Sequence, residues 1–274
     1  MKRNILAALS AVCIASAFMV SCKPMEPSTY TDTFHRIASV SYKDGKASML
    51  IDYTGETFIL SNFSTKEDML HFGVQDGDRV VARFTLEAVG NIYNNTLYLD
   101  GIVYKYPKLA LAESKPADSL NYAYRFTTLG LVSLTYPSAW SQGHIVNLAP
   151  EYYIADPNHK ADFLLYPTKV VGDTLQMNLY SDIPDTVRSW AMQQKFLCYD
   201  MSTLRNTVSD AKEQAHRDSI LDQLTALNQD SITVQIFAPD YMRKKIIDQN
   251  KEVQEIQFIN IRTESVEVSI PFDF

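Results

Sequence analysis

Apolar and polar residues alternate along residues 34–60, and this period of two predicts β-strands. The stretch FHRIASVSYKDGKASMLIDYTGETFIL contains the turn signals Asp44-Gly45 and Thr54-Gly55, which divide it into three strands. The alternation stops at residues 64–68, where Ser64 is a suitable N-cap for a short helix through about His71. Two further alternating runs follow, RVVARFTLEAV and TLYLDGIVYKYP. Three strands, a helical connection and two strands are the order of a five-stranded OB barrel, although SH3-like barrels share much of this pattern.

The second half of the chain is also rich in strands. After a connector punctuated by Pro107 and Pro116, segments such as GHIVNLAPEYYIA, DTLQMNLYSDIP and SITVQIFAPDY are separated by turns at the spacing of a β-sandwich. Residues 206–229 lack this alternation and are rich in helix formers. The sequence therefore predicts a mainly β protein, with an OB-like barrel over 34–112 and an immunoglobulin-like sandwich over 113–274. The helical insertion is expected to pack on the sandwich edge, or alternatively to bind a partner.

The N-terminus has the pattern of a secretory signal. Lys2 and Arg3 precede an apolar stretch at residues 5–20, which is shorter than the roughly 20 residues of a membrane-spanning helix. The following Met19-Val20-Ser21-Cys22 resembles the lipobox of bacterial lipoproteins, whose signal is removed before a lipid-modified cysteine. We therefore expect a signal peptide over 1–21, lipidation at Cys22 and a tether over 22–33; an ordinary secreted protein or an uncleaved anchor is the alternative. Lys23 favours the outer membrane, because inner-membrane retention is typified by Asp at that position.

Charge and cysteine content restrict the possible partners. The chain has 25 basic and 32 acidic residues, a net charge of −7 that becomes −9 once Lys2 and Arg3 are removed. This balance argues against nucleic acid or anionic lipid as a partner. Cys13 leaves with the signal and Cys22 is the expected lipid site, so Cys198 has no disulfide partner; its apolar surroundings, KFLCYD, predict a small buried side chain.

The order of these parts resembles the NigD-like lipoproteins, which have an N-terminal OB domain and a C-terminal β-sandwich. The resemblance rests on the lipobox at Cys22 and on the segments RIASVSYKDGKASMLIDYTGETFIL and GVQDGDRVVARFTLEA. It implies an envelope lipoprotein and brings no catalytic motif to transfer. A recurring Asp-Ser/Thr-aliphatic pattern also looks like a bacterial O-glycosylation site, although a turn that leads into a strand or helix gives the same pattern. The candidate acceptors are Ser119, Thr174, Thr186, Ser219 and Ser231.

No catalytic or metal-binding motif stands out. The five histidines are not at ligand spacing, and the sequence has no HExxH, Cys-x-x-Cys, Walker or GxSxG motif. We therefore predict no cofactor and no catalytic residue. Aromatic residues of the first half are expected to fill the barrel or to contact the second domain: Tyr42, Tyr53, Phe58, Phe84, Tyr98, Tyr104 and Tyr106.

Three functions remain open from the sequence. The first is a non-enzymatic envelope lipoprotein that binds a protein or a glycan, held at the membrane by its N-terminal lipid. The second is a structural subunit of an outer-membrane assembly. The third is a hydrolase assembled from scattered carboxylates.

Overall fold

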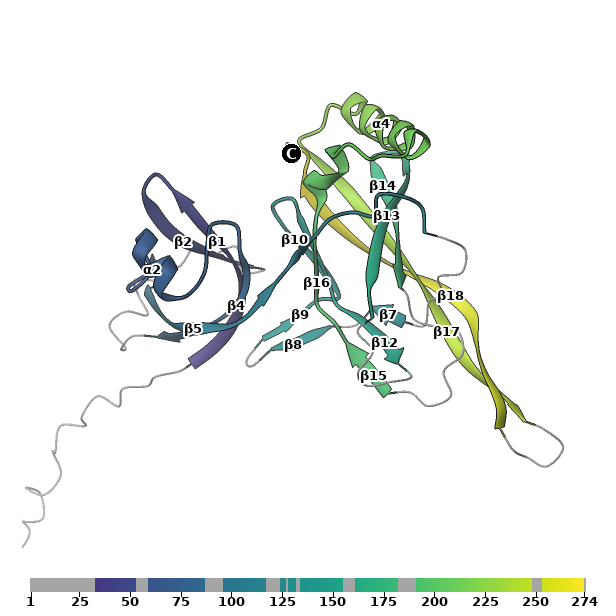
Figure 1. Ribbon diagram of the computed structural model, residues 1–274, viewed down its shortest axis with the longest axis horizontal. Helices are drawn as coiled ribbons and strands as arrows, with labels where there is room; N and C mark the ends of the chain where they lie inside the picture. Colours follow the sequence, from purple (N-terminus) through teal and green to yellow (C-terminus); the bar gives the residue numbers. More distant parts are fainter. Residues whose placement is uncertain are drawn as a thin grey trace, which may run out of the picture.

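The protein is mainly β, as expected, and its two halves differ in architecture (Figure 1). The computed structural model describes residues 33–52, 59–86, 96–116, 124–126, 128–131, 134–154, 161–181, 191–247 and 253–273. A barrel-like sheet forms the first half, and packed sheets with a helix form the second.

The first half is a nearly closed sheet of five strands in the order β2-β1-β4-β5-β3. Its strands are β1 (Thr33–Lys43), β2 (Lys46–Ile51), β3 (Ile59–Leu60), β4 (Arg79–Leu86) and β5 (Thr96–Tyr106). The β3–β5 pair is parallel and the other pairs are antiparallel. The predicted β1–β2 turn is present, because Asp44 and Gly45 both adopt positive φ angles, of 52° and 75°. Alternate side chains such as Met49, Ile51 and Val80 fill the interior.

A short helix, α2 (Lys66–His71), connects β3 to β4. Its N-cap is Thr65, so the predicted cap at Ser64 was wrong by one residue. Thr65 Oγ1 accepts a hydrogen bond of 3.2 Å from the Asp68 amide, and Asp68 Oδ2 accepts 2.8 Å bonds from the amides of Ser64 and Thr65. This reciprocal arrangement is a capping box, and the cap falls at the residue three positions before the acid. The amide donors from Ser64 and Thr65, together with the Thr65 hydroxyl, lower the pKa of Asp68.

The second half is a sandwich of two main sheets. One has the order β10-β11-β16-β6 and the other β13-β14-β17-β18. The strands of the first sheet are β6 (Lys108–Leu109), β10 (Ala139–Gln142), β11 (Ile145–Leu148) and β16 (Leu197–Asp200). Those of the second are β13 (Phe163–Val171), β14 (Thr174–Ser181), β17 (Ser231–Ile247) and β18 (Val253–Pro271). The main core lies between the sheets and contains Val146, Leu148, Tyr199, Met177 and Ile236.

Smaller sheets flank the sandwich. One has the order β15-β12-β7, formed by β7 (Tyr124–Phe126), β12 (Pro150–Ile154) and β15 (Ala191–Gln194). The other is the pair β8 (Leu129–Leu131) and β9 (Leu134–Tyr136). The ladder of β17 and β18 continues well past the other strands and forms a projecting hairpin (Figure 1).

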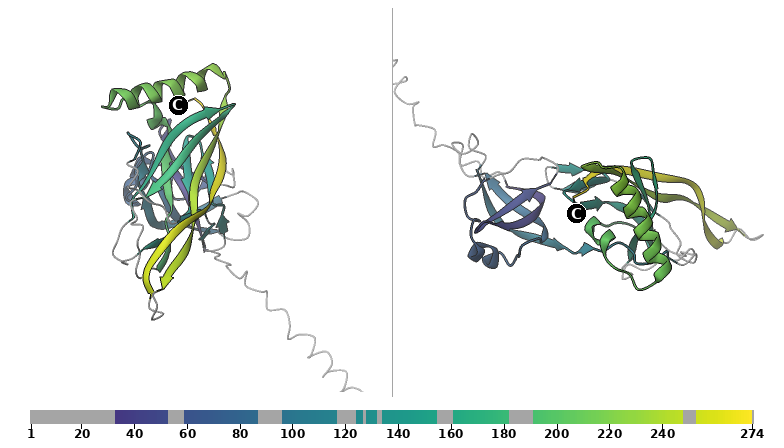
Figure 2. Two further views of the ribbon diagram at one scale, coloured as in Figure 1. Left: turned by 90° about the vertical axis from the view of Figure 1, so that its right-hand side faces the viewer. Right: turned by 90° about the horizontal axis from the view of Figure 1, so that it is seen from above.

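The expected helical insertion is present. A 3-10 helix, η2 (Met201–Arg205), is followed by α4 (Ala211–Ala226), which lies across one end of the sandwich (Figure 2). Ile220 and Leu224 of α4 belong to the main core, whereas the residues of its outward face, such as Lys212, Asp218 and Gln223, are polar and exposed. The helix therefore covers the sandwich and offers no apolar face to a partner. Among the described residues, no helix combines the length and the apolar character needed to cross a membrane.

The connector between the halves is bound tightly to the sandwich. Its strand β6 pairs in parallel with β16, although it lies before the boundary predicted at residue 112. Buried Arg217 of α4 donates hydrogen bonds to the carbonyls of Thr203 and Ala112, at 2.9 and 2.7 Å. The Leu111 amide donates to Thr203 Oγ1 at 3.0 Å, and the Ala112 amide to the Leu165 carbonyl at 2.9 Å. Burial lowers the pKa of Arg217.

Candidate functional site

The barrel and the sandwich share a small core of their own. Ile37 of β1 and Val81 of β4 point outward from the barrel and are buried against the sandwich. The sandwich contributes five residues to this cluster: Tyr136, Trp140, Ile145, Phe196 and Cys198. The junction between the two halves is therefore packed like a protein interior, and side chains on opposite sides of it hold fixed relative positions.

An ion pair lies at the centre of this junction. Arg79, at the start of β4, and Asp52, just after β2, are 1% and 0% exposed. The guanidinium faces the carboxylate with both terminal nitrogens: Nη1 donates to Oδ1 at 2.7 Å and Nη2 donates to Oδ2. Nη1 also donates to Ser39 Oγ at 2.7 Å. This two-point geometry fixes both side chains.

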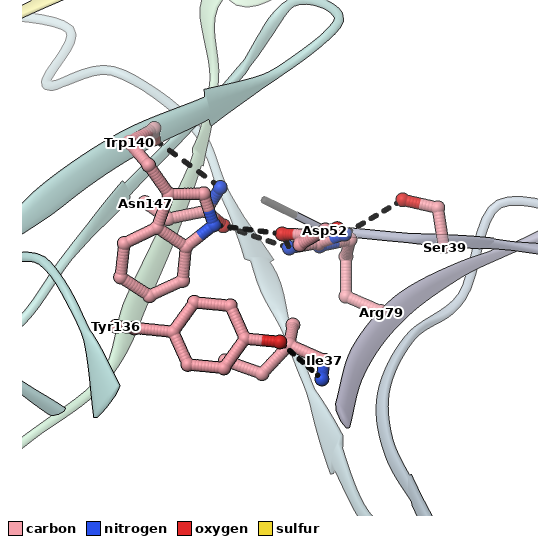
Figure 3. Close-up of polar contacts among 7 residues, drawn as sticks. All are labelled: Ile37, Ser39, Asp52, Arg79, Tyr136, Trp140 and Asn147. Carbon is pink, nitrogen blue, oxygen red and sulfur yellow. Dashed lines mark hydrogen bonds and ion pairs between the residues drawn. The ribbon is translucent and has the colours of Figure 1, made fainter. Parts of the chain in front are cut away.

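The sandwich completes this network from the other side (Figure 3). Asn147 Oδ1 accepts a 2.9 Å bond from Arg79 Nη2, and Trp140 Nε1 donates a 2.8 Å bond to Asp52 Oδ2. Asn147 Nδ2 in turn donates to the Trp140 carbonyl at 3.3 Å. The sandwich thus gives the guanidinium an acceptor and the carboxylate a donor, which offsets part of the cost of burying the pair, while Arg79 Nε is buried without a hydrogen-bond partner among the described residues.

The junction raises the pKa values of Arg79 and Cys198. Burial opposes the charge on Arg79, but the hydrogen bonds and attraction to Asp52 outweigh it and raise the pKa of Arg79. Burial raises the pKa of Cys198 to about 12, although the charge of Arg79 acts in the opposite direction. The Cys198 side chain is therefore a buried neutral thiol, as the sequence predicted, and lacks the exposure and low pKa of a nucleophile.

A groove of about 720 Å³ opens beside the junction, where the end of β5 meets the flanking strands of the sandwich. Its lining includes aromatic rings from both halves, amide side chains and one residue of each charge. The aromatic, amide and charged residues of the lining are Tyr104, Tyr106, Tyr152, Asp162, Phe163, Gln193, Gln194, Lys195 and Phe196. A concave site with aromatic walls and a few polar groups is the usual form of a small-ligand site.

The aromatic wall of the groove continues into the junction as a chain of ring contacts. The Tyr104 and Tyr106 rings lie 4.7 Å apart between centroids, and the Tyr106 and Phe196 rings 4.3 Å apart, both edge to face. Phe196 stacks on Trp140 at 5.3 Å, and Trp140 stacks on Tyr136 at 4.7 Å. The groove wall is thus supported by the same side chains that surround the ion pair.

The polar side of the groove comes from β15 and the loop before β13. Gln193 Oε1 accepts a long bond of 3.4 Å from the Tyr152 hydroxyl, and Gln194 Nε2 donates to the Thr128 carbonyl at 2.6 Å. Lys195 Nζ donates to the Ala161 carbonyl at 2.6 Å. These bonds orient the two amides and use one of the three N–H donors of the lysine.

The predicted modification sites fall in different places. Cys22, Ser119 and Thr186 lie outside the described residues, so the structure does not bear on lipidation or on two of the glycosylation candidates. Thr174 begins β14 and Ser231 begins β17, and these strands are parallel neighbours, so both sites lie at one end of the same sheet. Ser219 is exposed on α4 and accepts a 3.2 Å bond from Gln223.

The aromatic residues of the barrel divide into core, contact and surface positions. Phe84 is buried in the barrel and Tyr106 contacts Phe196 of the sandwich, as predicted. Tyr98 and Tyr104 are instead 39% and 55% exposed, so they neither fill the barrel nor lie buried at the contact. Two others, Tyr53 and Phe58, lie outside the described residues, and Tyr42 packs partly on the barrel core.

Sequence reasoning missed the ion pair and most of the groove. Nothing in the sequence distinguishes Asp52 and Arg79 from the other charged residues of the barrel. Asp52 directly follows β2 and continues the outer face that carries exposed Leu50, and such a face is normally exposed to solvent. The one signal in the sequence was that this outer side carries the apolar Leu50 and, two positions later, the acid Asp52. The groove residues come from separate segments of the chain, and no local pattern links them.

Comparison with known proteins gives a limited result. No family model and no curated protein matches the chain. Similar solved structures include an uncharacterised protein from Parabacteroides merdae ATCC 43184, with 11% identity and a TM-score of 0.46 over 88% of this chain and 99% of the other. A candidate lipoprotein from Bacteroides fragilis NCTC 9343 has 10% identity and a TM-score of 0.47, over 86% and 97% of the two chains.

A NigD-like immunity protein from Bacteroides caccae ATCC 43185 is also similar, with 13% identity and a TM-score of 0.40 over 82% of this chain and 91% of the other. A NigD-like protein is thus among the similar structures, as the resemblance seen in the sequence implied. Since all these identities are low and the TM-scores are below 0.5, we base the functional proposals on the contacts of this chain itself.

Proposed function

We propose that the protein is a non-enzymatic binding lipoprotein of the bacterial outer membrane, anchored through lipid on Cys22, and that the groove is its binding site. The observation that carries the proposal is the groove itself, whose aromatic wall is supported by a rigid, fully packed junction. A preformed site of this kind binds without the cost of ordering its own side chains. In this proposal the N-terminal half is an OB-like barrel that supplies Tyr104 and Tyr106.

Binding accounts for the groove better than catalysis does. Of the described residues, none form a group of three or more potential metal ligands. The groove lining, as far as the chain is described, has a single carboxylate, Asp162, whereas a glycosidase requires two. The neighbouring Cys198 thiol is buried and protonated, and the Lys195 amine is bound to a backbone carbonyl. The lining residues that the structure describes therefore offer groups for contact and include no activated nucleophile.

The anchor is tested by replacing Cys22 with Ser in the full chain. Cells grown with a labelled fatty acid are expected to label the parent protein and to place it in the outer-membrane fraction, and the Cys22→Ser variant is expected to lose both properties. An unlabelled parent protein, or a variant that still fractionates with the outer membrane, would contradict the anchor. Protease treatment of intact cells then distinguishes the surface face from the periplasmic face.

Binding at the groove is tested without assuming the class of ligand. Hydrogen–deuterium exchange of the mature chain is measured with and without detergent-solubilised envelope extract. The proposal expects slower exchange in the segments around residues 104–107 and 193–197, which line the groove. Protection confined to other segments, or none at all, would refute the groove as the binding site.

Modification remains a separate proposal. If any of Ser119, Thr174, Thr186, Ser219 or Ser231 is glycosylated, the intact mass of the native protein will exceed that of the polypeptide plus its lipid. A mass explained by the lipid alone removes all five candidates at once.

A further inference from the structure

We infer that the groove binds a neutral oligosaccharide, with Tyr104 as the ring on which a sugar unit stacks. The inference rests on the proposed binding function and adds the chemical class of the ligand. Three features lead to it: an exposed ring held in a fixed orientation, a pair of oriented amides, and a lining whose charges cancel.

The first feature is Tyr104. In the β4–β5 ladder Val81 lies opposite Tyr104 and Ala82 opposite Ile102, so Val103 is an extra residue in β5. This bulge interrupts the alternation of the strand and leaves Val103 and Tyr104 exposed in succession, at 57% and 55%. Bulges often redirect a side chain at a functional site, and here the result is a tyrosine that lines the groove.

The Tyr106 ring supports the Tyr104 ring and orients it. Tyr104 contacts Tyr106 edge to face, and Tyr106 contacts the buried Phe196, so the exposed ring is the outer end of a packed series. A rigid tyrosine offers a large flat surface at a low cost in conformational entropy. The C–H face of a pyranose ring is flat and weakly apolar, and it matches such a surface.

The second feature is the pair of amides on β15. The bonds described above use Oε1 of Gln193 and Nε2 of Gln194. Within the part of the chain that the structure describes, Gln193 Nε2 and Gln194 Oε1 make no hydrogen bond. These atoms are one donor and one acceptor on two residues that line the groove, and the hydroxyls of a sugar can act as both acceptor and donor.

The third feature is charge. The described lining contains one acid, Asp162, and one base, Lys195, and the lysine amine already binds the Ala161 carbonyl. A phosphate or carboxylate ligand requires cationic groups, and a hydrophobic ligand requires a closed apolar cavity. The groove has one lysine balanced by one acid, and although Pro107, Leu109, Leu129, Ala161 and Leu197 add apolar surface, it is open to solvent, so it fits neither ligand. A neutral polyhydroxylated ligand fits the ring surface and the free amide atoms together.

The test uses the mature chain with Cys22→Ser and four probes: maltohexaose, cellohexaose, mannohexaose and chitohexaose. Binding is measured by titration calorimetry for the parent chain and for two variants. Tyr104→Ala is expected to weaken binding of the hexasaccharide that the parent chain binds by about tenfold, because it removes the stacking surface. The matched control is Tyr98→Ala, an exposed tyrosine of the same strand that lies outside the groove lining. It is expected to bind like the parent chain.

The possible outcomes separate the inference from the function on which it rests. Failure of all four sugars to bind overturns the oligosaccharide assignment, and so does equal weakening by both tyrosine variants. A library of uncharged decapeptides is titrated in parallel. Peptide binding that depends on Tyr104, with no sugar binding, also overturns the assignment but leaves the groove as a binding site. Thermal unfolding of both variants checks that the loss of affinity is not a loss of fold.

Discussion

Replacing Asp52 with Asn tests the view that the buried ion pair holds the two halves together. The substitution preserves the shape of the side chain and removes its charge. Arg79, 1% exposed, would then face a neutral amide. One of the two Asp52 oxygens that accept its hydrogen bonds would be replaced by an NH2 group, which cannot accept a hydrogen bond. Asp52 Oδ2, which accepts from Arg79 Nη2, also accepts the 2.8 Å bond from the Trp140 indole N–H.

The expected cost follows from the burial of the arginine. Removing one partner of a buried ion pair costs about 3 to 5 kcal/mol, because the remaining charge stays out of water without compensation. The stability of an ordinary domain is about 5 to 15 kcal/mol, so this loss is a large part of the total. Since the guanidinium retains Ser39 and Asn147 as acceptors, we expect about 3 kcal/mol, the lower end of that range.

The measurement is equilibrium urea unfolding at neutral pH. The chain has two tryptophans, so both proteins carry Trp190→Phe; intrinsic fluorescence then reports on Trp140, which touches the pair, and far-ultraviolet circular dichroism reports on the strands. We expect a lower midpoint for the variant and, because the junction loosens first, a fluorescence transition that precedes the dichroism transition. A loss below about 1 kcal/mol with coincident transitions would refute the reasoning, since that size is typical of an exposed pair.

The double variant Asp52→Leu/Arg79→Met provides the comparison. It removes both charges and leaves the Trp140 N–H and Asn147 Oδ1 without these partners, at about 1 to 3 kcal/mol for each unsatisfied group. It is expected to be more stable than Arg79→Met alone, which leaves the Asp52 carboxylate buried and unpaired. If the double variant is the least stable of the series, the cost comes from packing and not from charge.

Three further predictions concern other parts of the structure. Arg217→Ala should lower the free energy of unfolding by about 2 to 4 kcal/mol, because its charged hydrogen bonds hold the carbonyls of Thr203 and Ala112. The exposed control on the same helix, Lys212→Ala, should change it by less than about 0.5 kcal/mol. The midpoints of urea unfolding of the two variants test this difference. Thr65→Ala should cost about 1 kcal/mol by thermal unfolding and Ser64→Ala much less, because only the Thr65 side chain caps α2, and the opposite order would restore the cap predicted from sequence. Burial raises the pKa of Cys198 from its ordinary value of 9.0 to about 12, so the unfolded state loses this proton first and stability should fall as pH rises between those values. Cys198→Ala should flatten that fall in urea midpoints measured from pH 8 to 11, and an unchanged slope would contradict the assignment.

Much of the fold could be predicted because it depends on local sequence patterns. The alternation around Met49 and Ile51 defines a strand with one solvent-exposed face and one buried face, and Asp44-Gly45 supplies the two positive φ angles of a tight hairpin. The long helix was also predictable, since residues 206–229 lack alternation and Asp210 caps the first turn. These features depend on neighbours within a few positions.

The junction and the groove could not be predicted in this way. Periodicity tells which residues share a face of a strand, but not what later covers that face. The alternation therefore does not show that the sandwich buries Val81 and Asp52. Tyr104 was recognised as an available aromatic residue, but its place beside Gln194 depends on contacts across about 90 positions of the chain. Only the folded arrangement of the two halves brings such residues together.

The chain order gives the buried ion pair a further consequence. Asp52 and Arg79 precede Trp140 and Asn147 in the chain, so the ion pair is synthesised before the side chains that complete its hydrogen bonds. The final network therefore depends on a segment that is made later, and neither half contains all of it.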